Sequence, residues 1–157
     1  MRKLFASFLN ELMFRNNKVW LLTGDVGYGL WDTIKTNHAN RFINPGAAEQ
    51  AMLDIGIGLA LQGQIPIIYS ITPFVLYRPF EAIRTYIDHE KIPVKLIGGG
   101  RNKDYLHDGI SHWAEDDIKI LSSLDHIRLY KPETLTIDLF NEFVYNTLPS
   151  YLNLKIK

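Results

Sequence analysis

Hydrophobic residues follow two kinds of pattern along this chain. One recurs every three or four residues, which is the spacing of a helix face, and the other is a short unbroken run, typical of a strand covered on both faces. The first pattern predicts helices over residues 1–14, 46–62, 73–90, 114–124 and 135–148. The second predicts strands over residues 18–22, 65–71, 91–100, 126–132 and 151–157, with a further short run, RFINPG, at 41–46.

The alternation of these elements predicts the fold class. Strands separated by helices at this spacing form βαβ units, so we expect an α/β fold with a mostly parallel sheet flanked by helices on both faces. In such folds ligands bind beyond the carboxyl ends of the strands. The loops of interest therefore follow Leu22, Ser70 and Ile97, and the last of them, residues 98–113, is the longest.

Length, charge and composition restrict the classes of function. A chain of 157 residues, 46% of them hydrophobic, is expected to form one domain over residues 1–157. Its net charge is zero and no run of Lys and Arg breaks the balance, so we expect neither nucleic acid nor a membrane as partner. Asn10 and Glu11 interrupt the apolar start and exclude a signal-peptide core there. The absence of cysteine excludes disulfides and thiolate chemistry and is compatible with the cytoplasmic location that we expect.

Two segments partly resemble known kinds of site, a dinucleotide-binding turn and a metal site, but neither has the full pattern. The glycines of GDVGYG fall at 24, 27 and 29, whereas a dinucleotide-binding turn needs the spacing G-x-G-x-x-G and a later acidic residue. His107, Asp108 and His112 are metal-ligand types, but no further strong ligand is spaced with them, which favours exposed loop residues. We therefore expect no metal site within this chain.

Glu49 is the most informative single residue. It lies in the first turn of the predicted helix 46–62, whose apolar pattern has few polar interruptions. The helix dipole favours a carboxylate at that position, whereas burial in an apolar groove favours the neutral acid. Taken alone, the pattern leaves two alternatives open, a solvated charge at a helix N-terminus or a half-buried proton donor.

Four segments taken together resemble a known family. The pieces GD, RFINPGAAEQ, YSITPFVLYRPFEAIR and DGISH have the order and spacing of the pyrimidine-binding domain of transketolase-like thiamine diphosphate enzymes, over about residues 1–150. The series GAAEQ, F-x-x-x-R-x-F-E-x-I-R and DG-x-x-H is far more specific than any one piece. The form SITPFVLYRPFEAIR is most similar to the split transketolase and deoxyxylulose-phosphate-synthase branches. The resemblance implies the thiamine diphosphate-binding fold and thiamine diphosphate as cofactor.

The resemblance also implies roles for individual residues. Thiamine diphosphate is activated when its pyrimidine nitrogen N1′ exchanges a proton with a carboxyl group, and the family's glutamate falls on Glu49. Glu49 and His112 are the implied catalytic residues. The implied cofactor-binding residues are Asp25, Val26, Glu49, Tyr69, Phe74 and Tyr77, with Phe74 stacking on the pyrimidine ring. The implied substrate-binding residues are Arg78, Asp108 and His112.

Several of these positions have alternatives by residue type. Tyr69 fits the hydrophobic core as well as a cofactor wall, and Arg78 fits a surface ion pair as well as a substrate contact. The loop reads DGISH where many members of the family have DGPTH, so it lacks a proline. Arg2 lies near the position of a phosphate-binding arginine of transketolases.

Other parts of a whole enzyme of this family are not found in the sequence. The family holds the cofactor's diphosphate through Mg²⁺ in a separate domain that carries GDG and a downstream Asn, a set of hard oxygen ligands. This chain has no such pair, and we expect it to contain neither a diphosphate-binding domain nor a C-terminal transketolase domain. We therefore expect a separately encoded diphosphate-binding subunit that supplies Mg²⁺ and completes the active site. Self-association is expected as well, with two copies of each subunit.

Two classes of function remain open. In the first, the chain is a transferase subunit, active only with its partner chain, that moves two-carbon ketol units between sugar phosphates. The related synthase reaction, from pyruvate and an aldehyde phosphate, belongs to the same class. In the second, the chain is a non-catalytic module that docks onto a thiamine diphosphate enzyme and regulates it.

Overall fold

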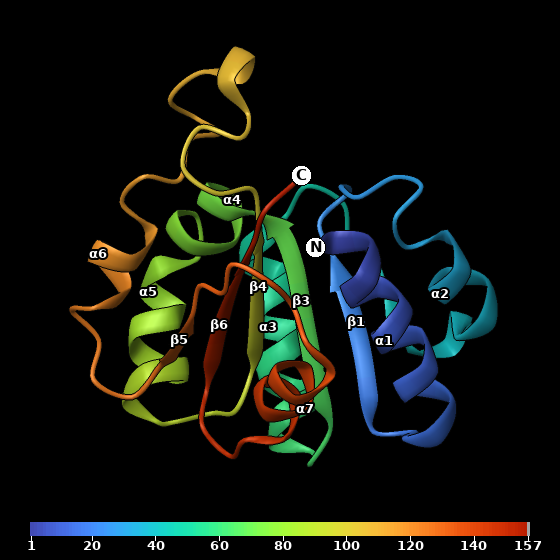
Figure 1. Cartoon of the computed structure of the whole chain (residues 1–157). Coiled ribbons are helices and arrows are strands. Elements are labelled where there is room, and N and C mark those ends of the chain that lie inside the picture. Colours follow the sequence, from blue (N-terminus) through green and yellow to red (C-terminus); the bar gives the residue numbers. More distant parts are fainter. Residues whose placement is uncertain (157) are drawn as a thin grey trace.

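The structure, a computed structural model, describes residues 1–156 as a central sheet between two layers of helices (Figure 1). All six strands run parallel, in the order β2-β1-β3-β4-β6-β5. The strands are β1 (Val19–Thr23), β2 (Phe42–Ile43), β3 (Ile65–Ile71), β4 (Lys95–Gly99), β5 (Arg128–Tyr130) and β6 (Ser150–Leu154). The predicted α/β class is confirmed, and the sheet is wholly rather than mostly parallel.

The helices divide into two groups by the face of the sheet that they cover. One face is covered by α3 (Glu49–Leu61), α4 (Thr72–Tyr77), α5 (Phe80–Ala82), η2 (Ile83–His89) and α6 (Asp117–Leu121). The other face is covered by α1 (Arg2–Arg15), α2 (Asp32–Asn37) and α7 (Ile137–Tyr145). Two short 3₁₀ turns, η1 (Ala39–Arg41) and η3 (Leu106–Asp108), complete the described elements.

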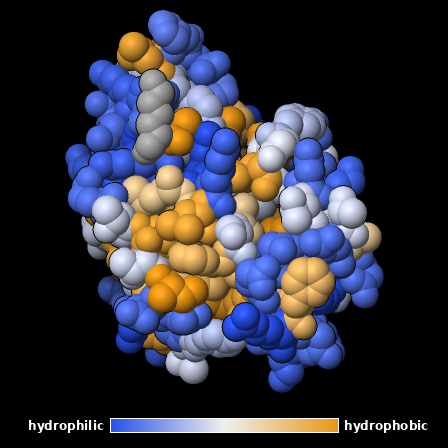
Figure 2. Space-filling model, turned by 45° about the vertical axis from the view of Figure 1, so that its right-hand side comes forward, coloured by the Kyte–Doolittle hydropathy of each residue, from blue (hydrophilic) through white to orange (hydrophobic). Residues whose placement is uncertain are grey.

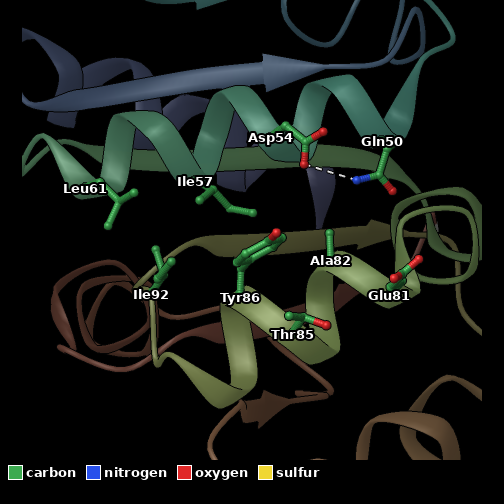
Figure 3. Close-up of a pocket in the computed structure, with 9 residues that line it drawn as sticks. All are labelled: Gln50, Asp54, Ile57, Leu61, Glu81, Ala82, Thr85, Tyr86 and Ile92. Atoms are coloured by element: carbon green, nitrogen blue, oxygen red, sulfur yellow. Dashed lines mark hydrogen bonds between the residues drawn. The ribbon is translucent and has the colours of Figure 1, made fainter.

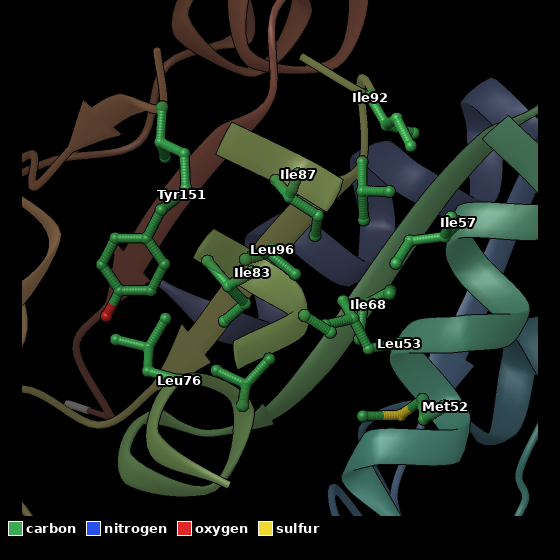
Figure 4. Close-up of a cluster of buried hydrophobic side chains, with 14 of the residues drawn as sticks. Met52, Leu53, Ile57, Ile68, Leu76, Ile83, Ile87, Ile92, Leu96 and Tyr151 are labelled. Atoms are coloured by element: carbon green, nitrogen blue, oxygen red, sulfur yellow. The ribbon is translucent and has the colours of Figure 1, made fainter. Parts of the chain in front are cut away.

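A continuous apolar core lies between the sheet and the first group of helices. Figure 4 shows Leu53 and Ile57 of α3 on one side and Ile83 and Ile87 on the other, with Ile68 of β3 among them. All five side chains are at most 8% exposed. Burial of such aliphatic side chains is worth about 1.5–3 kcal/mol each. This core fixes the position of α3 and α4, whose adjoining ends carry the candidate site.

A second core lies on the opposite face and is rich in aromatic residues. Phe5 of α1 packs edge-on against Phe140 and Phe143 of α7, at ring-centre distances of 5.1 and 6.1 Å. Outside this core, Leu4 of α1 and Ile137 of α7 are 44% and 49% exposed. The face turned forward in Figure 2, which includes α1, accordingly shows hydrophobic residues gathered near its centre with hydrophilic residues around them.

The predicted helix over residues 73–90 is wrong as a single element. Its first part, α4, ends at Tyr77, and the chain resumes as α5 at Phe80 and continues as the π-helix η2. The interruption falls at Arg78 and Pro79, because Pro79 lacks the N–H that would continue the helical hydrogen bonds, although Arg78 itself keeps helical backbone angles. The break leaves the Arg78 side chain at a helix end, half exposed.

Two further differences concern residues 24–48. The helix expected from residue 46 begins at Glu49, because Gly46 adopts a left-handed backbone with φ of 83° that a helix cannot include. Helix α2 was not predicted, since its six residues, DTIKTN, are too short and polar to show a periodic apolar face. The remaining predicted elements are present, with ends that agree or differ by a few residues, and Lys157 of the predicted last strand lies outside the described residues. None of the helices described within residues 1–156 is long and apolar enough to cross a membrane.

Candidate functional site

Glu49 is buried at the carboxyl-end edge of the sheet. It is the first residue of α3, and its side chain is only 2% exposed. Gly24, which directly follows β1, lies beside it: a methyl group placed on Gly24 would be 3.6 Å from the Glu49 Oε1 atom. Of the two alternatives that the sequence left open, a solvated charge is therefore excluded, and the carboxyl group lies where ligands bind in open parallel sheets.

Arg78 of the neighbouring segment pairs with this carboxylate and stacks on Phe74. Arg78 Nη1 donates to both carboxylate oxygens of Glu49, at 2.8 Å each. The guanidinium carbon of Arg78 lies 3.7 Å from the centre of the Phe74 ring, a cation–π contact. The Arg78 side chain is 47% exposed, so the pair is open to solvent on the arginine side only. The planar cation of Arg78 thus contacts both a buried carboxylate and an aromatic face.

The long loop after β4 brings His112 to the same place. The His112 ring packs edge-on against Phe74, with 4.9 Å between ring centres, and lies 5.8 Å from the ring of Tyr105. Its Nδ1 atom is 2.9 Å from the hydroxyl of Ser111. The predicted residues Glu49, Phe74, Arg78 and His112 therefore form one contiguous group, although they come from three separate segments. Neither Tyr105 nor Ser111 was singled out from the sequence.

Asp108 lies on the same loop, but no described contact joins its side chain to that group. The loop projects from the body of the molecule, with η3 at its tip (Figure 1), and Asp108 is exposed there. The backbone carbonyl of Asp108 accepts a hydrogen bond from the Ser111 hydroxyl at 3.3 Å, which closes the turn that presents His112. The structure thus connects Asp108 to His112 through the backbone of the turn, while the role of its carboxylate in substrate binding stays a prediction.

A buried polar network fixes the base of this loop. Arg101, at the loop's start, is 4% exposed and donates from Nε to the Asn153 side chain at 2.7 Å. Asn153 donates in turn to Asp117 at 2.9 Å, and the Tyr151 hydroxyl donates to the same carboxylate at 2.9 Å. These residues were missed in the sequence, where the available signal was a polar Asn153 inside the apolar run YLNLKIK.

Tyr69 and Tyr77 do not join the Glu49 group. Tyr69 is 1% exposed and points to the α1 side of the sheet, where its ring packs edge-on against Trp31 and its hydroxyl accepts from Arg2 at 3.3 Å. Burial raises the pKa of the Tyr69 hydroxyl. It is the core aromatic that its residue type allowed, and α3 with Glu49 lies across the opposite face of the sheet, so its contact with a cofactor stays a prediction. The hydroxyl of Tyr77 donates to Asp116, and burial together with that carboxylate raises its pKa.

Asp25 and Val26 lie in the loop after β1, next to Gly24. Asp25 has a left-handed backbone with φ of 56°, and its carboxylate accepts from the Tyr28 hydroxyl at 2.8 Å. Its N–H donates to the Asn44 side chain at 3.0 Å, which ties this loop to the segment that leads into α3. Val26 is half buried against the second core. Both residues therefore border the strand end near Glu49, and their contact with a cofactor stays a prediction.

A separate groove of about 530 Å³ runs along the outer side of α3. In Figure 3, Ile57 of α3 and Tyr86 of η2 point toward one another across it, and Gln50 is hydrogen-bonded to Asp54 at 3.1 Å. Its lining mixes aliphatic side chains with the polar residues Gln50, Asp54, Glu81 and Thr85 and contains no histidine. Across residues 1–156, no three His, Asp or Glu side chains gather in a way that could hold a metal ion. The group around Glu49 is accordingly the best candidate for chemistry.

The donor set around Glu49 fits an aminopyrimidine better than it fits a metal. An aminopyrimidine needs a carboxyl group for its ring nitrogen and an aromatic face for stacking, and the structure places Glu49 and Phe74 in contact with one shared planar group, the guanidinium of Arg78. A divalent cation would need several hard oxygen ligands, and Glu49 is the only carboxylate that the described contacts put there.

Known proteins of one family are similar to this chain. The profile of the family described as "Transketolase, pyrimidine binding domain" matches residues 1–136. A relative from Methanocaldococcus jannaschii, described as "Putative transketolase C-terminal section", is 29% identical over 133 residues, which cover 84% of this chain and 42% of the relative. A second relative, one of the subunits of the apulose-4-phosphate transketolase of Actinobacillus succinogenes, is 27% identical over 95 residues, which cover 60% of this chain and 30% of that protein.

Solved structures give the same result. The structure described as "Split gene transketolase, inactive beta4 tetramer" superposes with a TM-score of 0.82 at 25% identity, over 96% of this chain and 49% of that chain. This chain therefore spans less than half of the length of the relatives it matches. Because the family profile covers most of the chain and the fold agrees, the protein belongs to the transketolase pyrimidine-binding domain family.

Proposed function

We propose that this chain is the pyrimidine-binding subunit of a split, thiamine diphosphate-dependent transketolase-like enzyme. Its activity is the transfer of two-carbon ketol units between sugar phosphates, at an active site that a second subunit completes. One observation carries the proposal. Glu49 is buried at the carboxyl edge of a parallel sheet, and it is paired there with Arg78, which stacks on Phe74.

Glu49 has the central role in this proposal. When bound, thiamine diphosphate supplies a nucleophilic carbon that no side chain of this protein offers. Glu49 holds or releases the proton at ring nitrogen N1′, and its burial keeps water from competing for that proton. Phe74 stacks against the pyrimidine ring, while Asp25 and Val26 border it from the loop after β1.

Substrate contacts come from the projecting loop and from Arg78. In this proposal His112, which packs against Phe74, exchanges a proton with the substrate's oxygen, and Asp108 contacts the substrate's hydroxyl groups. Arg78 is half exposed and carries the charge that suits a phosphorylated substrate. The network of Arg101 and Asn153 positions the loop from beneath.

The proposed partner is a separately encoded subunit that binds the diphosphate and supplies Mg²⁺. Two observations support it: one of the relatives is named as a subunit of a transketolase, and a related split-gene transketolase is described as an inactive tetramer of its beta chain alone. The described residues offer no cluster of hard ligands for Mg²⁺. Self-association of this chain, in an assembly with two copies of each subunit, is part of the same proposal.

The ketol transfer has a close alternative within the same chemistry. A 1-deoxy-D-xylulose-5-phosphate synthase of Prochlorococcus marinus is 27% identical over 133 residues, which cover 83% of this chain and 20% of that enzyme. A synthase reaction from pyruvate and an aldehyde phosphate would use Glu49 in the same way and differ in the donor. Assay with a ketose phosphate and with pyruvate as alternative donors separates the two.

Replacement of Glu49 in the reconstituted complex tests the proposed function. Glu49→Gln keeps the shape of the side chain but cannot exchange the proton, so we expect the rate of ketol transfer to fall by about 10²-fold or more. Glu11→Gln, which changes an exposed glutamate on α1, is the matched control and should leave the rate unchanged. Thiamine diphosphate with Mg²⁺ titrated into the chain alone should bind weakly. Full activity of Glu49→Gln, or tight Mg²⁺-dependent binding without a partner, would contradict the proposal.

The second candidate is a non-catalytic module that docks onto a thiamine diphosphate enzyme and modulates it. The specific observation in its favour is the ion pair between Arg78 and Glu49, which neutralises the very carboxylate that the chemistry needs. The same experiment discriminates the two, because a docking module predicts no effect of Glu49→Gln on the activity of the complex.

A further inference from the structure

Arg78 occupies the space that the proposed function reserves for a ring. Its guanidinium is in hydrogen-bond contact with both oxygens of Glu49, at 2.8 Å, and its carbon lies 3.7 Å from the centre of the Phe74 ring. Aromatic and guanidinium planes in van der Waals contact leave no gap between them. A second planar group therefore cannot stack on that face of Phe74 and reach Glu49 while Arg78 stays in this position.

The guanidinium and an aminopyrimidine have the same recognition chemistry. Both are planar and delocalised, both present N–H donors in the plane to a carboxylate, and both stack on an aromatic face. Glu49 and Phe74 supply one carboxylate and one aromatic face, so they can satisfy one such group at a time. An internal group and an incoming ring would compete for these two residues.

Arg78 is also free to leave. It lies at the break between α4 and α5, and its side chain is 47% exposed. Within the part of the chain that the structure describes, its polar and cation–π contacts are to Glu49 and Phe74 alone. Arg101 offers the contrast, because it is 4% exposed and bonded to Asn153, Pro132 and Glu133. About half of the Arg78 side chain already contacts water, so the guanidinium can be hydrated as it leaves, and an incoming ring would replace it as the donor to the buried carboxylate.

We propose that Arg78 is an internal stand-in for the aminopyrimidine ring: its guanidinium fills the slot between Glu49 and Phe74 in the cofactor-free subunit and swings out when the ring enters. The inference rests on the proposed function, since it presumes that an aminopyrimidine is the ligand. We call Arg78 in this position the latch, which is closed when its guanidinium lies between Glu49 and Phe74 and open when it has swung out. The cofactor-free subunit keeps its buried carboxylate paired, and cofactor affinity is lowered by the fraction of time that the latch is closed.

The test uses 4-amino-5-hydroxymethyl-2-methylpyrimidine, the pyrimidine half of the cofactor, titrated into the full chain and followed by NMR. If Arg78 fills the slot about nine-tenths of the time, Arg78→Ala should bind the fragment about tenfold more tightly than the unmodified chain. Arg84→Ala, which removes an exposed arginine on η2, is the matched control and should bind like the unmodified chain. Arg78→Lys keeps the charge but not the plane and should give an intermediate affinity, which covers the case that Arg78→Ala folds poorly.

A second readout reports on Arg78 directly. Its side-chain protons lie over the Phe74 ring and should resonate upfield, and they should return toward their free positions as the fragment is added. Fragment binding that is unchanged or weaker in both Arg78 variants, or Arg78 resonances that do not move in the unmodified chain, would overturn the latch alone. If the fragment binds none of the variants, and thiamine diphosphate does not bind the reconstituted complex, the proposed function fails and the latch with it.

Discussion

Two buried carboxylates at the same edge of the sheet have opposite surroundings. Asp117, at the start of α6, is 0% exposed and accepts from Tyr151, Asn153 and Lys131 at 2.9, 2.9 and 3.3 Å. Glu49, at the start of α3, has a side chain that is 2% exposed, and over residues 1–156 it accepts from Arg78 alone. One carboxylate is saturated by donors from several elements, and the other depends on a single half-exposed group.

This difference separates a structural charge from one available to a ligand. A buried carboxylate surrounded by fixed donors resists change, because every donor would lose its partner at the same time. A buried carboxylate with a single removable partner can exchange that partner for a ligand at little cost. Burial by itself therefore does not identify a functional residue. The number of hydrogen-bond partners, and whether they can move away, distinguishes Glu49 from Asp117.

The largest effect that we expect follows from removing the saturated carboxylate. Asp117→Ala leaves the buried groups of Tyr151 and Asn153 without their acceptor and the loop base without its anchor. The free energy of unfolding should fall by about 3–5 kcal/mol, measured by urea denaturation. Asp125→Ala, at an exposed position after α6, is the control and should change it by no more than about 0.5 kcal/mol. A loss below about 1 kcal/mol at Asp117 would break the comparison.

A third buried charge sharpens the comparison, because it has acceptors but no ion-pair partner among the described residues. Lys95 is 1% exposed and donates to the carbonyls of Asn146 and Leu148, both at 2.7 Å. Burial, with the nearby charge of Arg128, lowers the pKa of Lys95 to about 7.

The sign of the pH dependence follows from that shift. Between pH 7 and about 10.4, the ordinary value for lysine, the unfolded chain binds a proton at Lys95 that the folded chain has released, so stability rises with pH. We expect a gain on the order of 1–2 kcal/mol between pH 7 and 9 that Lys95→Met lacks, measured as the difference between the two denaturation profiles. Parallel profiles for the two proteins would show that the acceptors keep the lysine charged.

The smallest effect is expected at Glu49. Glu49→Gln keeps an oxygen acceptor for Arg78 and removes a buried charge whose partner is half exposed, so the free energy of unfolding should change by less than about 1 kcal/mol. The same substitution is expected to abolish proton exchange with the cofactor. Replacement of Glu49 should therefore affect activity much more than stability, whereas replacement of Asp117 should have a large effect on stability. If Glu49→Gln lowered the free energy of unfolding as much as Asp117→Ala does, Glu49 would be a structural residue like Asp117 and not a carboxylate available to a ligand.

Much of the fold could be predicted because it depends on local patterns. The apolar face of α1 and the unbroken run of β3 follow directly from side-chain spacing, and the alternation of such elements implies a parallel sheet. The pattern was insufficient at α2, whose six residues are polar, and at Pro79, where a long apolar periodicity concealed a break. At α2 the sequence offered no periodic signal, and at Pro79 a local backbone property outweighed the signal that was present.

The candidate site was predicted in part and for a different reason. Glu49, Phe74 and His112 were identified through family motifs, and the structure brings them into one group. Tyr69 was placed there as well, but alternation along β3 turns it to the opposite face of the sheet, beside Trp31. The motif gives the residue and its neighbours in sequence, whereas the side of the sheet depends on strand register.

The amino-acid sequence by itself determined most of the order of helices and strands, the family, and the presence of a carboxyl group at the first turn of α3, because each of these depends on residue spacing or on short contiguous motifs. Only the tertiary structure decided what that carboxyl group touches. Arg78 and Glu49 are brought together by the packing of α3 and α4 on one face of the sheet, and Asp117 meets Asn153 and Tyr151 through the adjacency of α6 to β6. Such partners are chosen by three-dimensional packing between distant segments, which no local pattern encodes.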